Sequence, residues 1–326
     1  MTTLNTLDGV LVQWGDRLFY PSNRSTKTRT PPLTGLPLRQ RAQALRQRIH
    51  ATVVRRAPQV MVKVTGGGRG MGAIAAHLRY IAKGGRLPFE DDRGVTRDGK
   101  EALRASVDQW RLGGSRIPEV SDRREAFNIM LSMPAGTQPE FVLKATREFA
   151  KAELANHRYL MVLHKHQANP HVHLSVRAEG RDGKRLNPRR EDLRRWRETF
   201  AQRLRGWGIE AEASSQVTRG TRHHNERVWE RKTARPRKLD PMKAEPLPSG
   251  NRKRALQAWV EITRALAASP DSSDRKLAKS IYDFLERLPA VQAIVRQRER
   301  QRELPGMGRS PVAPSPLQRR GPEIER

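Results

Sequence analysis

The sequence contains no cysteine, which excludes disulfide bonds, thiolate zinc sites and cysteine nucleophiles. Aromatic residues make up only 5% of the 326 residues, so few bases of a nucleic acid can stack on aromatic rings. No apolar stretch approaches the length of a membrane span, and the first residues lack the basic start and apolar run of a secretory signal. We therefore expect a cytoplasmic protein that does not insert into membranes.

Acidic residues are also few relative to basic ones. The chain has 64 Lys and Arg against 34 Asp and Glu, which gives a formal net charge of +30. Such an excess favours a polyanionic partner, most often a nucleic acid. An acidic membrane surface is the alternative, but no basic amphipathic anchor with exposed aromatic residues stands out.

The apolar pattern places the main domain at residues 58–228, where strands and helices follow in the order β-α-β-α-β-β-α. The strands at 158–166 and 171–178 are joined by a short turn and must pair antiparallel. The predicted fold class is α+β, with an antiparallel-centred sheet and helices packed on it. Residues 1–57 are expected to form a basic N-terminal extension, and residues 229–326 a basic, helical and partly disordered C-terminal region.

Local signals give more detailed expectations for the flanking regions and the core. Residues 10–20 resemble a hairpin with its turn near Gly15 and Asp16, and residues 39–56 an exposed helix. Residues 59–65 resemble a buried strand. Thr137 and Asn187 are the expected N-caps of two core helices. Further helices are expected at 73–83, 100–112, 252–268 and 273–303.

Four histidines lie in the segment "HKHQANPHVHLSV", at positions 164, 166, 171 and 173. Side chains two residues apart on a strand share a face, so a tight hairpin would bring both pairs together. Imidazole is the commonest protein metal ligand, and three nitrogens leave positions open for a substrate oxygen. We therefore predict a site for a divalent cation, the alternative being unrelated polar residues at a strand end.

A glycine-rich segment, "GGGRGMG", lies between the first core strand and its helix. Backbone amides at such a helix start can hold phosphate, although the Walker pattern is absent and the dinucleotide fingerprint matches only loosely. A flexible loop beside the site and a loop that contacts DNA are equal alternatives. Tyr80 follows in the helix, with His77 one turn earlier.

Two segments, "HKHQANPHVHL" and "HLRYIAKGG", resemble motifs of the conjugative relaxases, which are plasmid mobilisation nucleases of the HUH type. The resemblance covers about residues 58–220. It implies that Tyr80 attacks a scissile phosphate in the origin of transfer and that His164, His171 and His173 bind a divalent cation, Mg²⁺ or Mn²⁺. The implied products are a 5′-phosphotyrosine and a free 3′ hydroxyl, so that the strand can later be rejoined.

Some roles stay open under this resemblance. His166 stands where the family often has an acidic residue, and it could be a further ligand, a base for Tyr80 or a group behind the ligands. His77 could contact Tyr80 or the phosphate, or simply lie on an exposed helix face. Tyr159 and Tyr20 are the alternative nucleophiles.

The expected partner is DNA, as a single-stranded or melted origin of transfer, with accessory transfer proteins and a coupling ATPase as further partners. The candidate DNA contacts are Arg69, Arg79, Arg189, Arg190 and Arg194. A rolling-circle replication initiator or a transposase of the same chemistry is an alternative function. A non-catalytic nucleic-acid-binding protein is the alternative of another class.

Overall fold

A computed structural model describes residues 6–20, 33–220 and 250–303 of the chain. Six strands form one antiparallel sheet in the order β1-β4-β6-β5-β2-β3. The strands are β1 (Met61–Gly68), β2 (Phe89–Asp91), β3 (Thr96–Arg97), β4 (Ala126–Ser132), β5 (His157–His164) and β6 (His171–Gly180). The predicted α+β class with an antiparallel-centred sheet is confirmed.

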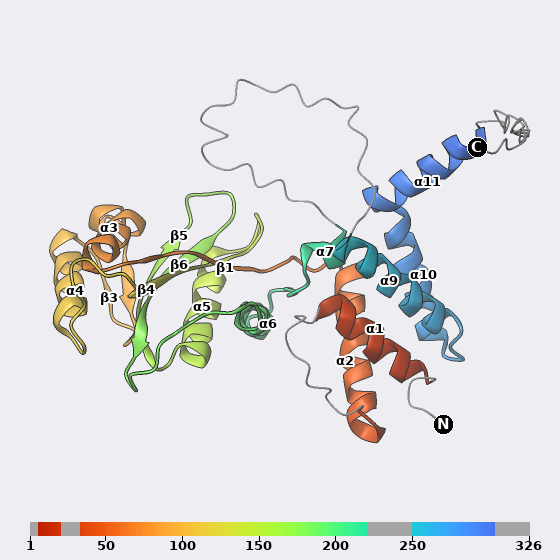
Figure 1. Ribbon diagram of the computed structural model, residues 1–326, viewed down its shortest axis with the longest axis horizontal. Coiled ribbons are helices and arrows are strands. Elements are labelled where there is room, and N and C mark those ends of the chain that lie inside the picture. The colour runs from red at the N-terminus through yellow and green to blue at the C-terminus, as the bar shows by residue number, and fades with distance from the viewer. Residues whose placement is uncertain (1–5, 21–32, 221–249, 304–326) are drawn as a thin grey trace, which may run out of the picture.

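Helices cover both faces of this sheet (Figure 1). On one face, α5 (Pro139–Glu153) and α6 (Arg190–Gly206) bury Phe149, Trp196 and Phe200 against alternate residues of β4, β5 and β6. On the other face, α3 (Met71–Ile81) and α4 (Lys100–Leu112) pack over the intervening residues. The one-turn helix η2 (Lys83–Gly85) follows α3. β5 is therefore apolar on both faces, with Leu160 and Val162 toward α3 and α4, whereas β6 carries His171, His173, Ser175 and Arg177 on that face.

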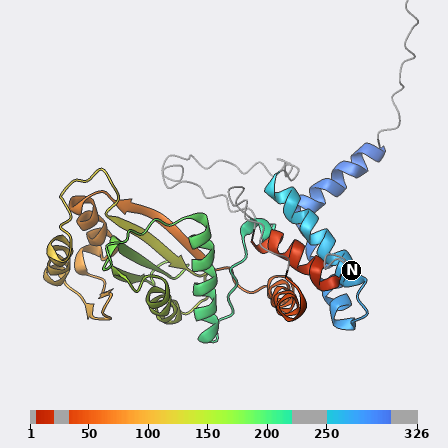
Figure 2. The ribbon, with the colours of Figure 1, turned by 60° about the horizontal axis from the view of Figure 1, so that its bottom comes forward.

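A second core lies beside the sheet and is built from both ends of the described chain. It joins α1 (Leu7–Phe19), α2 (Gly35–Val53), α9 (Asn251–Ala267) and α10 (Ser272–Glu286). Figures 1 and 2 show these helices together on the α6 side of the sheet. The short α7 (Gln216–Arg219) links the two bodies, and α11 (Pro289–Glu303) follows α10. We call α1, α2, α9 and α10 the helical cluster.

The hairpin predicted at residues 10–20 is wrong, because this segment is the helix α1. Its buried residues, Leu11, Gly15, Leu18 and Phe19, recur at helical spacing and face the helical cluster. Gly15 is needed for close packing rather than for a turn, since a Cβ at this position would lie 2.9 Å from the Leu45 side chain of α2.

Two expectations about exposure are also wrong. The helix predicted at 39–56 is α2, but it is not an exposed helix, because Leu38, Ala42, Leu45 and Ile49 are buried in the helical cluster. The strand predicted as buried is the edge strand β1, where Val62 is buried and Met61 and Lys63 are exposed. An edge strand with one open face alternates in this way.

The helices predicted at 73–83, 100–112 and 252–268 correspond to α3, α4 and α9, with small shifts of their ends. The predicted helix 273–303 is two helices, α10 and α11, which separate before Pro289. The predicted N-caps are wrong by one or two residues, since Gln138 precedes α5 and Arg189 precedes α6. The hydroxyl of Thr137 instead donates to the Pro134 carbonyl.

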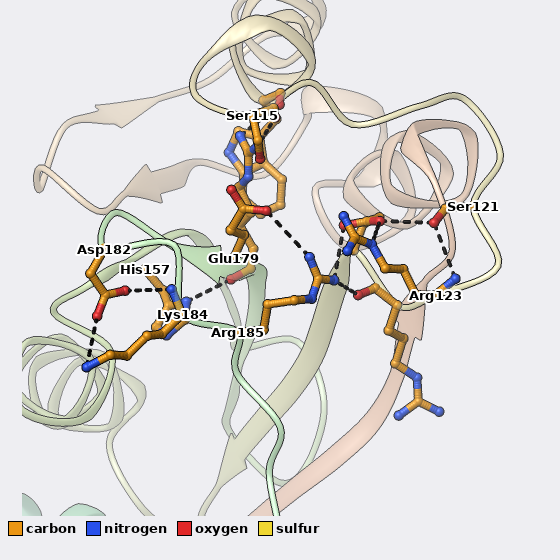
Figure 3. Close-up of polar contacts among 12 residues, drawn as sticks. Ser115, Ser121, Arg123, His157, Glu179, Asp182, Lys184 and Arg185 are labelled. Carbon is orange, nitrogen blue, oxygen red and sulfur yellow. Dashed lines mark hydrogen bonds and ion pairs between the residues drawn. The ribbon is translucent and has the colours of Figure 1, made fainter.

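A polar network fixes the end of β6 that lies away from the hairpin (Figure 3). Arg185 pairs with Glu179 on β6 and with Glu125, which directly precedes β4. Ser121 and Arg123 also bind the buried Glu125 carboxylate, at 2.9 and 2.8 Å. The segment that leads from α4 to β4 is therefore tied to the sheet.

No described helix is long and apolar enough to cross a membrane.

Candidate active site

The β5–β6 hairpin brings three histidines to one face of the sheet. His164 ends β5 and pairs directly with His171, which begins β6. His173 follows two residues later and shares the face of His171. Leu160 and Val162, which alternate with the residues of the opposite core, pack toward α3 and α4 from this same face. His164, His171 and His173, here called the histidine triad, therefore lie on the α3 side of the sheet.

The three imidazoles are close enough to share one ion. The ring centroids of His164 and His173 are 4.6 Å apart, and both other pairs are separated by 5.0 Å. One ring nitrogen from each residue lies within 4.8 Å of the others. His164 and His171 are buried, and His173 is half-buried.

Backbone carbonyls fix the tautomers of two of these rings. His164 Nε2 lies 2.7 Å from the Ile81 carbonyl, and His171 Nδ1 lies 2.9 Å from the Asn169 carbonyl. A carbonyl only accepts hydrogen bonds, so each of these nitrogens donates and the other nitrogen of the ring keeps its lone pair. His173 Nδ1 is buried and has no hydrogen-bond partner among the described residues.

The protonation states suit a metal site. Burial lowers the pKa of His164, although the hydrogen bond to the Ile81 carbonyl acts in the opposite direction. Burial, together with the neighbouring His164, His171 and His77, lowers the pKa of His173 to about 3. Neutral rings offer lone pairs at neutral pH, and the carbonyl end of α3, where a helix carries partial negative charge, lies beside them. The triad therefore fits a divalent cation.

Tyr80 lies next to this triad, in the last turn of α3 directly before Ile81. Its side chain is 75% exposed. Tyr80 borders a hollow of about 480 Å³ together with two members of the triad, His164 and His173. The residues that line it are Arg79, Tyr80, Lys83, Arg86, His164, His166, Gln167 and His173. Because the described lining holds three cationic side chains and no acidic one, the hollow attracts a polyanion.

The other two histidines considered from the sequence also lie here. His166 is exposed in the hairpin turn, beyond the end of β5, and its ring lies 5.2 Å from that of His164. His77 lies 6.5 Å from both the Tyr80 ring and the His173 ring. Its Nε2 is buried without a partner among the described residues, and burial lowers its pKa. His77 is therefore half-buried beside the triad and does not occupy an exposed helix face.

The alternative nucleophiles lie elsewhere. Tyr159 is only 4% exposed and packs in the core on the opposite face of the sheet. Burial, helped by the nearby carboxylates of Asp92, Glu90 and Asp91, raises its pKa to about 12, which disfavours its phenolate. Tyr20 directly follows α1, and the guanidinium groups of Arg41, Arg48 and Arg194 lie over its ring. Neither residue faces the triad.

The arginines predicted to contact DNA do not lie together. Arg79 lines the hollow, whereas Arg69 donates to the Asp122 carbonyl at 3.0 Å. Arg189, Arg190 and Arg194 lie at the start of α6 and along it, on the face of the sheet opposite the triad. Arg194 lies over the Tyr20 ring at 5.2 Å.

The glycine-rich segment does not form the phosphate-binding loop considered as one alternative. Gly66, Gly67 and Gly68 belong to β1 and pair with β4. The backbone amides of Met71 and Gly72, at the start of α3, donate to the Pro118 and Glu119 carbonyls at 2.9 and 3.2 Å. These amides are therefore already occupied by the protein itself.

Lys83 and Arg86 line the hollow but were not identified from the sequence. The signal was present in the segment "YIAKGGR", where Lys83 and Arg86 follow Tyr80 closely in the sequence. Their proximity to the histidines depends on the turn after α3, in which Gly84 and Gly85 have φ angles of 70° and 92°. Glycine tolerates this left-handed region, so the chain can reverse here.

Part of the chain matches a known protein family. Residues 89–209 match the family model described as "Relaxase: MobA/VirD2-like, nuclease domain". This segment is similar to a relaxase nuclease domain. The matched segment contains the whole histidine hairpin and begins nine residues after Tyr80.

One solved structure similar to this chain is described as "Molecular Basis of Vancomycin Resistance Transfer in Staphylococcus aureus". The match covers 49% of this chain and 99% of that chain, with 16% sequence identity and a TM-score of 0.28. None of the curated proteins matches this chain.

Proposed function

We propose that this relaxase nicks and rejoins one DNA strand at the origin of transfer of a plasmid or integrative element, with Tyr80 as the nucleophile. The main support is that Tyr80, two histidines of the triad and three cationic side chains line the same hollow. A DNA strand in this hollow would meet an exposed phenol beside neutral imidazoles, while its phosphates would be attracted by Arg79, Lys83 and Arg86.

In the proposed reaction, the Tyr80 oxygen forms a bond to phosphorus and the bond from phosphorus to the 3′ oxygen breaks. The products are a 5′-phosphotyrosine and a 3′ oxygen that takes up a proton to become a hydroxyl. A tyrosine hydroxyl has a reference pKa of about 10, so its proton must pass to a base as the attack proceeds. His166 is the candidate for this base, because it is exposed and lines the same hollow. The reverse reaction rejoins the strand.

We further propose that His164, His171 and His173 hold a divalent cation. When bound, such an ion neutralises the charge that develops on the phosphate oxygens. Mg²⁺ and Mn²⁺ are the candidates, and three imidazole ligands favour Mn²⁺, since Mg²⁺ prefers oxygen ligands. The Ile81 and Asn169 carbonyls orient two of the rings toward the ion.

The proposed substrate is single-stranded or melted origin DNA, with accessory transfer proteins and a coupling ATPase as further partners. Among the candidate contacts, Arg79 adjoins the reaction site. Arg69, Arg189, Arg190 and Arg194 lie away from the hollow, so they would contact DNA outside the reacting segment.

Tyr80→Phe tests the proposal, because it removes the nucleophilic oxygen and keeps the ring. We expect loss of nicking of supercoiled origin plasmid in Mn²⁺, loss of the covalent protein–DNA adduct and unchanged DNA binding. Tyr282→Phe, at an exposed tyrosine of α10, is the matched control and should retain full activity. Nicking is measured on agarose gels, and the adduct by a mobility shift under denaturing conditions.

The two variants separate the alternatives. An adduct that persists in Tyr80→Phe would identify another nucleophile. Intact DNA binding without any adduct in the unsubstituted chain would instead indicate a non-catalytic nucleic-acid-binding protein.

A further inference from the structure

The edge strand β1 carries a lysine, Lys63, on the same face of the sheet as the triad. The sequence alone did not identify it. Lys63 of β1 pairs with Met130 of β4, and Met130 pairs with His173 of β6. Directly opposed residues of antiparallel strands point to the same face, so Lys63, Met130 and His173 form one row across three strands. A parallel row contains Met61, Ser132 and His171.

The outer part of these rows is open from His173 and Met130 to the sheet edge, whereas Ser132 and His171 are buried. Lys63 is exposed, Met61 is 44% exposed and Met130 is half-buried, so neither α3 nor α4 covers this part of the sheet. None of the residues in the two described rows is acidic. Two strand spacings place Lys63 about 10 Å from His173 along the sheet.

The surface continues from the triad in the direction away from the hollow. Arg79 lies in the last turn of α3, Lys83 begins η2 and Arg86 follows it, and all three line the hollow beside His166 and Gln167 of the hairpin turn. Lys63 lies at the other side of the triad, on the edge strand of the sheet. A DNA strand with one phosphate at the triad extends in both directions, so it needs a path on each side.

The geometry points to a track for single-stranded DNA that runs from the histidine triad over Met130 to Lys63. This inference rests on the proposed function. Lys63 binds a backbone phosphate of the strand that leaves the reaction site, while Met61 and Met130 give the bases an apolar, adaptable floor. The pairing of β1 with β4 makes Lys63 a positioning residue for the nicking reaction.

Lys63→Ala tests this track in the full-length chain, with Lys151→Ala as the matched control. Lys151 is an exposed lysine of α5, on the opposite face of the same sheet, so both variants lose one positive charge. Binding of a fluorescein-labelled oligothymidylate is followed by fluorescence anisotropy over a series of salt concentrations. We expect Lys63→Ala to weaken binding about three- to tenfold and to reduce the slope of log affinity against log salt by about 0.7. Lys63→Arg should bind as the unsubstituted chain does.

The outcomes distinguish the track from the proposed function. Equal effects of Lys63→Ala and Lys151→Ala, or no effect of Lys63→Ala, would overturn the track and leave the nicking proposal standing. A failure of the unsubstituted chain to bind the oligonucleotide would overturn the track, whereas the nicking proposal stands or falls with the covalent adduct on origin plasmid. A nicking assay on origin plasmid adds a second readout, since Lys63→Ala should raise KM more than it lowers kcat.

Discussion

At the scale of single residues, His173 is the member of the triad with the strongest signs of a missing ligand. Its Nδ1 is buried without a hydrogen-bond partner among the described residues, whereas His164 and His171 each donate to a carbonyl. A buried polar nitrogen without a partner costs free energy unless something satisfies it. The lowered pKa of His173 keeps its ring neutral near neutral pH, so the ring retains a lone pair. A bound cation would supply a partner for this ring.

His173→Ala tests this assignment through binding rather than catalysis. We expect the unsubstituted chain to bind Mn²⁺ at one site and His173→Ala to bind it at least about tenfold more weakly, because one of three ligands is removed. Isothermal titration calorimetry measures the affinity, with Mg²⁺ titrated in parallel. His50→Ala, at an exposed histidine of α2, is the control and should bind as the unsubstituted chain does. Equal Mn²⁺ affinities of the two variants would contradict the triad as the cation site.

At the scale of elements, α3 is held at both ends. Its first amides, from Met71 and Gly72, donate to the carbonyls of Pro118 and Glu119, and its last turn contacts His164 through the Ile81 carbonyl. The segment after α4 is anchored in turn by Arg177 of β6, a buried residue whose guanidinium donates to the Gly113 and Ser115 carbonyls. The position of Tyr80 therefore depends on contacts at the far end of its helix.

Gly70→Ala should disturb this arrangement. Gly70 has a φ of 92°, and a Cβ there would lie 2.4 Å from the Glu119 carbonyl oxygen, so the start of α3 must shift. We expect a loss of more than about 1 kcal/mol in the free energy of unfolding, measured with urea, and slower nicking.

Gly72→Ala is the control for this prediction. Its added Cβ would meet its nearest neighbour at an ordinary 3.5 Å, within a regular helix. Because alanine favours helix over glycine by up to about 1 kcal/mol, this variant should be as stable as the unsubstituted chain or more stable. Similar losses in both variants would show that the contact with Glu119 does not position the helix.

Sequence patterns predicted the helices and strands whose apolar residues recur at regular spacing. They failed where contacts between distant segments determine the conformation or the role of a residue. The β5–β6 hairpin, α3 and α4 follow from apolar spacing. Gly15 was misread as a turn residue because its role depends on Leu45 of α2, which is distant in the sequence. The short strands β2 and β3 were missed, since three and two residues show no period.

Within the candidate site, too, residues marked by local pattern were predicted, and a residue placed by tertiary contacts was not. The histidines were identified by local spacing on a hairpin, and Tyr80 by resemblance to a family. Lys63 could not be found in this way, because its place beside the triad depends on the pairing of β1 with β4 and of β4 with β6. Register between distant strands is set by tertiary contacts rather than by local pattern.

At the scale of the whole molecule, we propose that residues 58–228 form the catalytic domain and that the flanking regions, 1–57 and 229–326, contribute to a separate function. Within the described residues, both flanks supply helices to the helical cluster. Arg46 of α2 connects them, since it pairs with Asp8 of α1 and Asp274 of α10, each at 2.9 Å. The Asp274 side chain is almost fully buried and also accepts a hydrogen bond from Ser269.

Arg46→Met should therefore loosen the helical cluster without changing the relaxase domain. The variant keeps much of the apolar stem but leaves the Asp274 carboxylate without its cation, and we expect a loss of about 2 kcal/mol in the stability of the cluster. Arg39→Met, at an exposed position of the same helix, is the control and should change stability by less than about 0.5 kcal/mol. Differential scanning calorimetry measures both variants, and Mn²⁺-dependent nicking is assayed alongside.

Since the triad lies on the sheet face away from the cluster, Arg46→Met should nick at the normal rate below the temperature at which the cluster unfolds. A parallel loss of nicking at low temperature would show instead that the cluster and the catalytic domain act as one unit.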